Sequence, residues 1–273
     1  MRFTQLDVFG DGGLTGNPLA VVHNADGLET EQMQALAAWF NLSETAFLVK
    51  PTETRADYQV RIFTPSEELP FAGHPTLGSA HAWLAAGGRP HSAHHIVQEC
   101  GVGLVELRGF NGRMAFAAPP LRRNEPLTKT QVSAIAKVIG VPATQWVAHA
   151  WGDNGAPWQM VQLSDAEAVR SVQPKRQFAK PDQYIGLIGL NDPEDPFAYE
   201  VRALTPDGED PVTGSLNAAA AQWLRQRDLA SASYMVTQGS ALGRHGEIYV
   251  DDDGTNLWIG GRARVAITGD LKL

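Results

Sequence analysis

Alternating apolar and polar residues recur in many short stretches of this chain. Examples are AFLVK, DYQVRIF, WQMVQL, YEVRAL, SYMVTQG and GEIYVDD, separated from one another by Gly, Pro and polar residues. A period of two places successive side chains on opposite faces of a strand, so the pattern predicts mostly antiparallel sheet. Residues 30–40 (TEQMQALAAWF) and 129–140 (KTQVSAIAKVIG) instead repeat every three to four positions, which predicts amphipathic helices. The expected fold class is α+β.

One segment of the chain occurs twice. Residues 61–74 read RIFTPSEELPFAGH and residues 202–215 read RALTPDGEDPVTGS, with six identities in fourteen positions at a constant offset of 141. Each copy continues into small apolar residues that end in Trp-Leu. Because a third copy is lacking, the repeat indicates a two-fold duplication rather than a solenoid.

The duplication predicts how the chain is divided. Residues 76–86 and 216–224 are apolar or small on every side, and a helix of that kind must be buried all round. We therefore expect two pseudo-symmetric halves, each a mostly antiparallel, barrel-like sheet wrapped around a central helix. The halves are residues 1–122 and 123–273, with the last strand either in the second half or crossing back to the first. The Pro-rich and charged residues 119–127 (PPLRRNEPL) predict a linker between them.

Composition narrows the class of protein. The chain has 273 residues, of which 43% are hydrophobic and 19% charged, a composition typical of a well-packed fold. The net charge of −8 and the lack of a Lys/Arg-rich run argue against nucleic-acid binding. Cys100 is the single cysteine, which excludes an internal disulfide and a zinc site of several thiolates. No apolar run is long enough for a membrane span or a signal sequence, so a cytoplasmic protein is expected.

Both repeat helices begin at a glycine-led turn, Gly73-His74-Pro75 and Gly214-Ser215-Leu216. Helix N-termini offer unpaired N–H groups and a positive dipole end, which together suit a ligand carboxylate. His74 opens the first helix and Asp210 precedes the second, so both are candidates for handling protons. The alternatives are that His74 only caps its helix and that Asp210, before Pro211, only forms a turn.

Glu44 lies in NLSETAF, where a polar turn leads into an apolar strand. A solvated loop glutamate is the ordinary interpretation. If Leu42 and Phe47 partly desolvate the carboxyl, its pKa rises toward the range in which the group can both give and take a proton. His91, His94 and His95 stand in a polar stretch without a neighbouring acid or thiol in the sequence, so a solvated loop is expected there rather than a metal site.

The chain resembles the phenazine-biosynthesis isomerase-like (PhzF-like) family over nearly its whole length. The resemblance rests on DVFGDGGLTGNPLAVV, NLSETAF, RIFTPSEELPFAGHPTLGSAHAWL and EDPVTGSLNAA, in this order and spacing. It implies a diaminopimelate-epimerase-like fold with the active site between two similar halves. It also implies an isomerase that moves a proton on a ring carboxylate of the anthranilate type, with neither metal nor organic cofactor.

The same resemblance implies the roles of individual residues. Glu44 of the SET motif would be the main acid/base, with His74 of GHP and Asp210 of DP-x-TGS as catalytic partners. The residues that would contact substrate, chiefly its carboxylate, are Ser43, Gly73, Gly214 and Ser215. A small-molecule carboxylate and a second copy of the chain are the expected partners. Whether Leu216 and Asn217 alter the pocket stays open.

Two other functions remain as alternatives. One is an amino-acid epimerase or racemase of the same fold, which could not use the two-thiol mechanism because only Cys100 is present. The other is a catalytically silent protein that binds a small molecule, since a fold does not guarantee an activity.

Overall fold

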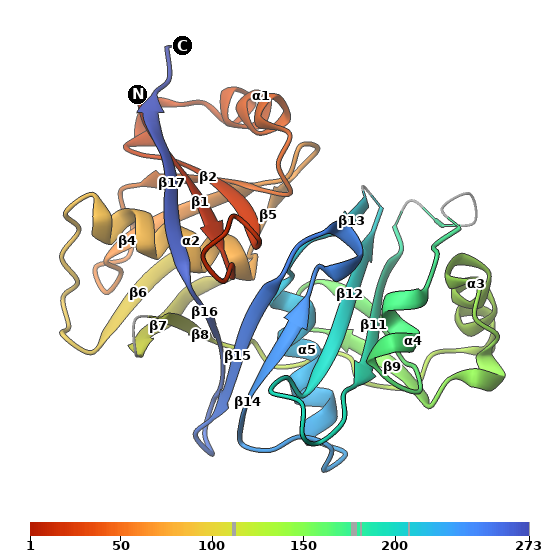
Figure 1. Ribbon diagram of the computed structural model, residues 1–273. Helices are drawn as coiled ribbons and strands as arrows, with labels where there is room; N and C mark the ends of the chain where they lie inside the picture. The colour runs from red at the N-terminus through yellow and green to blue at the C-terminus, as the bar shows by residue number, and fades with distance from the viewer. Residues whose placement is uncertain (111–112, 176–178, 181, 207, 273) are drawn as a thin grey trace. The chain divides into compact units, whose positions relative to one another are not determined.

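The computed structural model describes residues 1–110, 113–175, 179–180, 182–206 and 208–272. Within these residues the chain forms five α-helices and seventeen strands, a mixed α/β fold (Figure 1). The helices predicted at residues 30–40 and 129–140 are confirmed as Thr30–Phe40 and Lys129–Ile139. None of the helices in the described part of the chain is long and apolar enough to cross a membrane.

The chain divides into two compact units. The first unit contains Met1–Ala117 and Gly260–Leu273, and the second contains Ala118–Ile259. The strands of the first unit are β1 (Arg2–Val8), β2 (Asn17–Val22), β3 (Thr45–Val49), β4 (Tyr58–Phe63), β5 (Glu68–Leu69), β6 (His95–Cys100), β7 (Gly103–Phe110), β8 (Arg113–Ala117) and β17 (Ala263–Asp270). Its helices are η1 (Ala25–Gly27), α1 (Thr30–Phe40) and α2 (Gly73–Ala85).

The second unit contains three α-helices. They are α3 (Lys129–Ile139), α4 (Ala166–Ser171) and α5 (Gly214–Arg225), with short turns η2 (Ala143–Gln145) and η4 (Ser240–Leu242). Its strands are β9 (Ala148–Asp153), β10 (Pro157–Gln162), β11 (Tyr184–Leu190), β12 (Tyr199–Thr205), β13 (Gly208–Asp210), β14 (Ser233–Gln238), β15 (Gly246–Asp252) and β16 (Leu257–Gly261). The final two residues of β16 already belong to the first unit.

Strand pairing follows the same scheme in each unit. β1–β2 and β9–β10 are antiparallel, and β2–β3 and β10–β11 are parallel. The pairs β3–β4 and β11–β12 are antiparallel, and β4–β6 and β12–β14 are parallel. The repeated sequence segment forms β4, β5 and α2 in one unit and β12, β13 and α5 in the other. Its 141-residue offset therefore joins segments that occupy equivalent places in the two pairing schemes.

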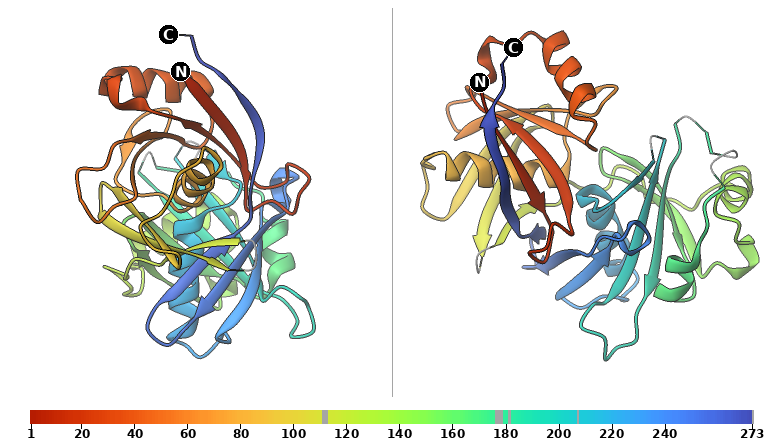
Figure 2. Two further views of the ribbon diagram at one scale, coloured as in Figure 1. Left: turned by 90° about the vertical axis from the view of Figure 1, so that its left-hand side faces the viewer. Right: turned by 45° about the horizontal axis from the view of Figure 1, so that its top comes forward.

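The last strand of the chain completes the sheet of the first unit. β17 pairs antiparallel with β1 from Arg2↔Asp270 to Val8↔Ala263, and the two strands lie side by side in both views of Figure 2. The N-terminal ammonium of Met1 donates to the carbonyl oxygen of Leu271 at 2.7 Å. Both ends of the chain thus belong to one unit.

The repeat helices are largely buried because their side chains are small or apolar. α2 packs against β1, β2, β3, β4, β6, β8 and β17. At Gly78 a Cβ would lie 2.4 Å from a Leu19 methyl group, so only glycine permits this close approach. In α5, Leu216 through Ala221 are buried, and the helix lies among the strands of its unit in Figure 1. The last turn of α2 emerges, with Leu84 37% exposed.

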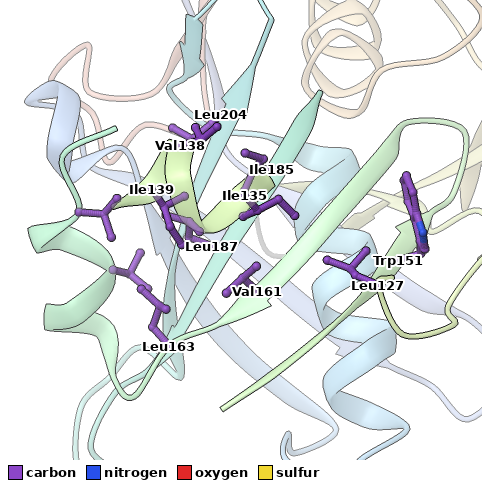
Figure 3. Packing of buried hydrophobic residues seen from close by; sticks show 12 residues of the cluster. Leu127, Ile135, Val138, Ile139, Trp151, Val161, Leu163, Ile185, Leu187 and Leu204 are labelled. Carbon is purple, nitrogen blue, oxygen red and sulfur yellow. The ribbon is translucent and has the colours of Figure 1, made fainter. Parts of the chain in front are cut away.

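The apolar face of α3 packs into the core of the second unit. Its residues Ile135, Val138 and Ile139 point toward side chains of β10 and β11 (Figure 3). Thr128 caps its N-terminus by accepting from the Gln131 N–H, and Gly140 ends it with φ 72°. This left-handed conformation strains residues with a Cβ. Glycine adopts it without strain, so the chain can leave the helix at this position.

Residues 119–127, expected to link the two halves, follow directly after the passage of the chain from the first unit to the second at Ala117 and Ala118. They belong to the second unit and run along β9. Arg122 N–H donates to the Asp153 carbonyl at 2.6 Å, and Trp151 N–H donates to Glu125 at 2.9 Å. The Arg123 guanidinium lies 3.8 Å from the centre of a Trp151 ring. Backbone pairing and this cation–π contact hold the segment in place.

Candidate active site

Glu44 lies on the turn that joins α1 to β3. α1 ends at Asn41, whose left-handed conformation (φ 51°) reverses the chain, and β3 begins at Thr45. Because β2 and β3 are parallel, Asn17 at the start of β2 and Glu44 just before β3 stand at the same edge of the sheet. α2 packs against both strands and brings its second residue, His74, to this edge.

The structure places Glu44 and His74 together. Oε2 of Glu44 lies 3.4 Å from Nδ1 of His74, and the side chain of Glu44 keeps 14% of its surface exposed against 2% for His74. Burial lowers the pKa of His74 to about 3, so the imidazole is neutral. Its Nε2 has no hydrogen-bond partner among the described residues. A carboxylate reachable by solvent thus stands beside a neutral, buried imidazole.

Asn17 is a site residue that the sequence reasoning missed. It is fully buried, and its Nδ2 lies 3.3 Å from Nδ1 of His74. An amide at this distance can fix which ring nitrogen carries the proton. Asn17 is the asparagine of the GNPLAVV motif, but an asparagine before a proline is usually interpreted as an ordinary turn residue.

Two of the expected substrate-contacting residues flank this pair. Ser43 is half-buried and directly precedes Glu44. Gly73 is buried and forms the first residue of α2, with Ala72 as the N-cap in extended conformation. The N–H groups of the first helical turn have no acceptor within the helix, so Gly73 stands where backbone can bind an anion.

The second unit carries the other predicted residues at the N-terminus of α5. Oδ2 of Asp210 accepts from the Thr213 hydroxyl at 2.5 Å, and Gly214 is the first residue of the helix. The Ser215 Oγ accepts from the indole N–H of Trp158 at 3.0 Å. This contact leaves the hydroxyl hydrogen of Ser215 to be donated elsewhere.

Gln238 organises this helix start and was not identified from the sequence. Its Oε1 accepts from Thr213 N–H and from the Asn217 amide, each at 2.9 Å. Its Nε2 donates to the Thr213 hydroxyl at 2.9 Å and to the Asp210 carbonyl at 3.0 Å. Asn217, like Leu216, is fully buried, so both residues belong to the interior of the unit.

Other candidates do not form a site of their own. His91 does have an acidic partner, contrary to expectation, since its Nδ1 lies 2.8 Å from Oδ1 of Asp57. Cys100 is buried at the end of β6, and burial raises the pKa of its thiol. In the described ranges no cluster of three or more His, Cys, Asp or Glu side chains could hold a metal ion.

A carboxylate beside a neutral imidazole is an arrangement that enzymes use to transfer protons. The chain belongs to the phenazine biosynthesis-like protein family (PhzC-PhzF), whose model matches residues 6–270. It is an isomerase of that family.

Three relatives and one solved structure are similar to this chain. The chain is 35% identical to the antisense-enhancing sequence 1 protein of Schizosaccharomyces pombe, covering 98% of this chain and 97% of that protein. It is 32% identical to an uncharacterized isomerase of Mesorhizobium japonicum, covering 92% and 90%. It is 43% identical to the trans-2,3-dihydro-3-hydroxyanthranilate isomerase of Pseudomonas chlororaphis, over 43% of this chain and 41% of that protein. The PhzF-family phenazine biosynthesis protein of Bacillus anthracis matches with a TM-score of 0.86 and 21% identity, covering 100% and 99%, which shows the fold.

Proposed function

We propose that this isomerase moves a proton on a small, carboxylate-bearing metabolite without a cofactor. Glu44 is the acid/base, and the observation that carries this assignment is its 3.4 Å contact with the buried His74. Because His74 is neutral, with a pKa of about 3, it does not compensate the carboxylate by charge. The carboxyl group is therefore left without a counter-charge from His74, which suits a group that must alternate between two protonation states.

The reaction balances within the substrate. The ionised Glu44 removes a proton from a carbon atom, and the electron pair of the broken C–H bond moves into the adjacent π system. The protonated Glu44, whose side chain is 14% exposed, exchanges its proton with solvent and then donates one to a different carbon atom, where a new C–H bond forms. Product and substrate have the same composition, so no oxidant or reductant takes part. The neutral His74, with Nδ1 3.4 Å from Oε2 of Glu44, forms the wall beside the carboxyl group.

Substrate binding is proposed for residues of both units. Gly73 and Gly214 would offer backbone N–H groups at the starts of α2 and α5, where the helix dipole favours a carboxylate. Ser43 and Ser215 would donate hydroxyl hydrogens, and Asp210, fixed by Thr213, would position the substrate. The matching pairing schemes support two pseudo-symmetric halves, each a sheet wrapped around its central helix, as in a diaminopimelate-epimerase-like fold.

A ring carboxylate of the anthranilate type is the proposed substrate class. The Pseudomonas chlororaphis relative is named for trans-2,3-dihydro-3-hydroxyanthranilate, and this compound is the first substrate to test. The compound is incubated with the protein in D2O, and product is analysed by NMR and mass spectrometry. We expect an isomer that carries one deuteron at the newly protonated carbon. Unchanged compound, or an isomer formed equally by Glu44→Gln, would overturn the proposal.

Epimerisation is the second candidate function, favoured by the same acid/base geometry. A two-thiol mechanism is excluded because Cys100 is the single cysteine. Epimerisation by Glu44 would instead exchange the α-proton of an amino acid for deuterium and invert its configuration. A panel of L-amino acids in D2O, read by chiral chromatography, separates this reaction from ring isomerisation. A silent binding protein would show neither isomerisation nor exchange.

A further inference from the structure

A cavity of about 400 Å³ lies in the first unit at the end of α2 that is remote from His74. Its residues follow from strand direction. β2 runs from Asn17 to Val22 and β3 from Thr45 to Val49, in parallel, so His23 and Lys50 mark the edge of the sheet opposite Asn17 and Glu44. α2 likewise starts beside Glu44 and ends at this cavity with Ala86 and Gly87. The cavity is therefore distinct from the Glu44–His74 site.

His23 is a buried histidine that lines the cavity. The residue is 5% exposed, and its Nε2 forms a 2.9 Å hydrogen bond with the hydroxyl of Thr4. Thr4 is the hydrogen-bond partner that the described part of the chain provides for this ring, so Nδ1 is left for a ligand. A polar atom on a residue buried to this degree costs free energy unless a partner satisfies it.

An aromatic pair lines the cavity. The rings of Tyr58 and Trp83 stack at 5.3 Å with an interplanar angle of 27°. The Tyr58 hydroxyl is turned away to donate to Oε1 of Gln98 at 2.9 Å. Gly88 packs on the Trp83 indole so closely that a Cβ would lie 2.3 Å from it, which fixes the indole in place. The pair forms a rigid, mostly apolar wall of the cavity.

The carboxylates that line the cavity are hydrogen-bonded to the chain, whereas the cations that line it make no ion pair in the described part of the chain. Asp57 is already satisfied, because it accepts the N–H groups of His91 and Val97 at 2.7 Å each. Asp26 accepts the backbone N–H of Lys50 at 2.8 Å. By contrast, the guanidinium of Arg2 and the ammonium of Lys50, both on exposed residues, make no ion pair within the described ranges. The two carboxylates already accept hydrogen bonds from the chain, whereas the two cations make no ion pair with a described residue, so the cations are the charged groups left to bind a ligand.

The end of α2 does not oppose this charge. Its last carbonyl groups are capped, since Ala86, Gly87 and Gly88 donate to Ala82, Leu84 and Trp83 respectively. These bonds satisfy the carbonyl groups that carry the partial negative charge of a helix C-terminus, about half a unit.

We propose that this cavity is a second binding site, for a small organic anion with a flat ring. The carboxylate of the ligand engages Arg2 and Lys50, its ring lies against Trp83, and His23 Nδ1 completes the contacts. The site is independent of the isomerisation proposed for Glu44.

A titratable reporter lies within the site. Burial and then the charge of Arg2 lower the pKa of His23. A bound anion offsets the Arg2 charge, so the pKa of His23 rises on binding. The other charged groups that line the cavity with His23 and Arg2 are Lys50, Asp26 and Asp57.

The test uses benzoate as the anion and neutral benzamide as its uncharged counterpart. Imidazole resonances of the full chain are followed by NMR, with His23→Gln and His74→Gln assigning the two signals. We expect benzoate to shift His23, benzamide to bind at least about tenfold more weakly, and Arg2→Gln with Lys50→Gln to weaken benzoate by at least about tenfold, the worth of one charge-assisted hydrogen bond. Lys129→Gln, an exposed lysine on α3, should leave the affinity unchanged.

Failure of this proposal and failure of the isomerase proposal are distinguishable. Benzoate that shifts His74 and leaves His23 unaffected would refute the second site and leave the first untouched. Equal affinities for benzoate and benzamide, or an unchanged affinity in the Arg2→Gln/Lys50→Gln variant, would also refute it. Glu44→Gln should retain the His23 shift. Inorganic phosphate is added as a competitor that lacks a ring. Benzoate should bind more tightly than phosphate, and a higher affinity for phosphate would contradict the proposed role of the ring.

Discussion

Arg202 binds Glu209 through two parallel hydrogen bonds, from Nε to Oε1 and from Nη2 to Oε2, at 2.8 Å each. The equivalent pair in the first unit, 141 residues earlier, is Arg61 and Glu68, with both bonds at 2.7 Å. The two pairs link β12 to β13 and β4 to β5, and so they hold the strand before each repeat helix. Their environments differ, because the side chains of Arg202 and Glu209 are 4% and 9% exposed and those of Arg61 and Glu68 are 27% and 38% exposed.

Arg202→Ala should lower the free energy of unfolding by about 3–5 kcal/mol, because it strands the buried carboxylate of Glu209. The Val172 carbonyl also loses its 2.6 Å bond from Nη1. Arg61→Ala is the matched control, and solvent screening should limit its cost to about 1 kcal/mol. Urea unfolding followed by circular dichroism measures both variants. Equal losses of unfolding free energy in the two variants would show that burial does not make the Arg202–Glu209 pair more important for stability.

The duplication explains how much of the fold could be predicted. The shared Arg, Thr, Pro, Glu, Pro and Gly located the strands and helix of the repeat because each residue has a local role that the sequence exposes. Thr64 and Thr205, for example, both accept a hydrogen bond from the N–H three residues ahead. The pairing of β17 with β1 could not be fixed, since nothing local specifies a partner more than 250 residues away. The contacts of residues 119–127 with β9 are likewise not local, so the sequence did not reveal them.

The neutral state of His74 makes stability depend on pH. Its pKa is about 3 in the folded chain, and an unfolded histidine has a pKa near 6.5. Between these values only the unfolded state binds the proton, so stability falls as pH decreases from about 6.5 toward 3. At about 1.36 kcal/mol per pH unit the loss reaches about 4–5 kcal/mol.

His74→Gln removes this titration and should flatten that part of the pH dependence. The free energy of unfolding of both proteins is measured by urea titration at several values between pH 7 and pH 4. The decrease for the wild type should exceed the decrease for the variant. Parallel curves would mean that the folded chain tolerates a protonated His74.

Gln238→Leu should destabilise the second unit and impair substrate binding. The variant leaves the Thr213 N–H, the Asn217 amide and the Asp210 carbonyl without the partners that Gln238 supplies. The Asn217 amide keeps its bond to the Thr213 carbonyl, so two groups are left unsatisfied, and at about 1–3 kcal/mol each the total is about 2–6 kcal/mol. KM should rise more than kcat falls, because Asp210 is proposed to position the substrate.

Gln226→Leu serves as the control for that variant. Gln226 is an exposed residue just after α5, and the substitution should change stability by about 0.5 kcal/mol or less. Steady-state kinetics and urea unfolding of the two variants are compared. A Gln238→Leu protein with the KM of the wild type would show that the hydrogen bonds at the start of α5 do not serve the substrate.

The candidate site was predictable where residue type alone carries the chemistry. Glu44, His74 and Asp210 can give or take protons, so each drew attention in a turn or at a helix start. Asn17, Gln238 and Asn217 act by holding other groups, and amides with that role look like any polar residue in a sequence. Only the structure shows that Asn17 lies 3.3 Å from His74, although 57 residues separate the two.

Glu44→Gln tests the acid/base assignment most directly. Glutamine keeps the size of the side chain and can occupy the same place beside His74, but it cannot exchange a proton with a carbon atom. Turnover and deuterium incorporation should therefore fall by about two to four orders of magnitude, the usual worth of a general acid/base, while ligand affinity changes little. Glu53→Gln, an exposed glutamate on the loop after β3, should match the wild type. If Glu44→Gln keeps more than about a tenth of wild-type turnover, less than any such effect, Glu44 only shapes the turn before β3.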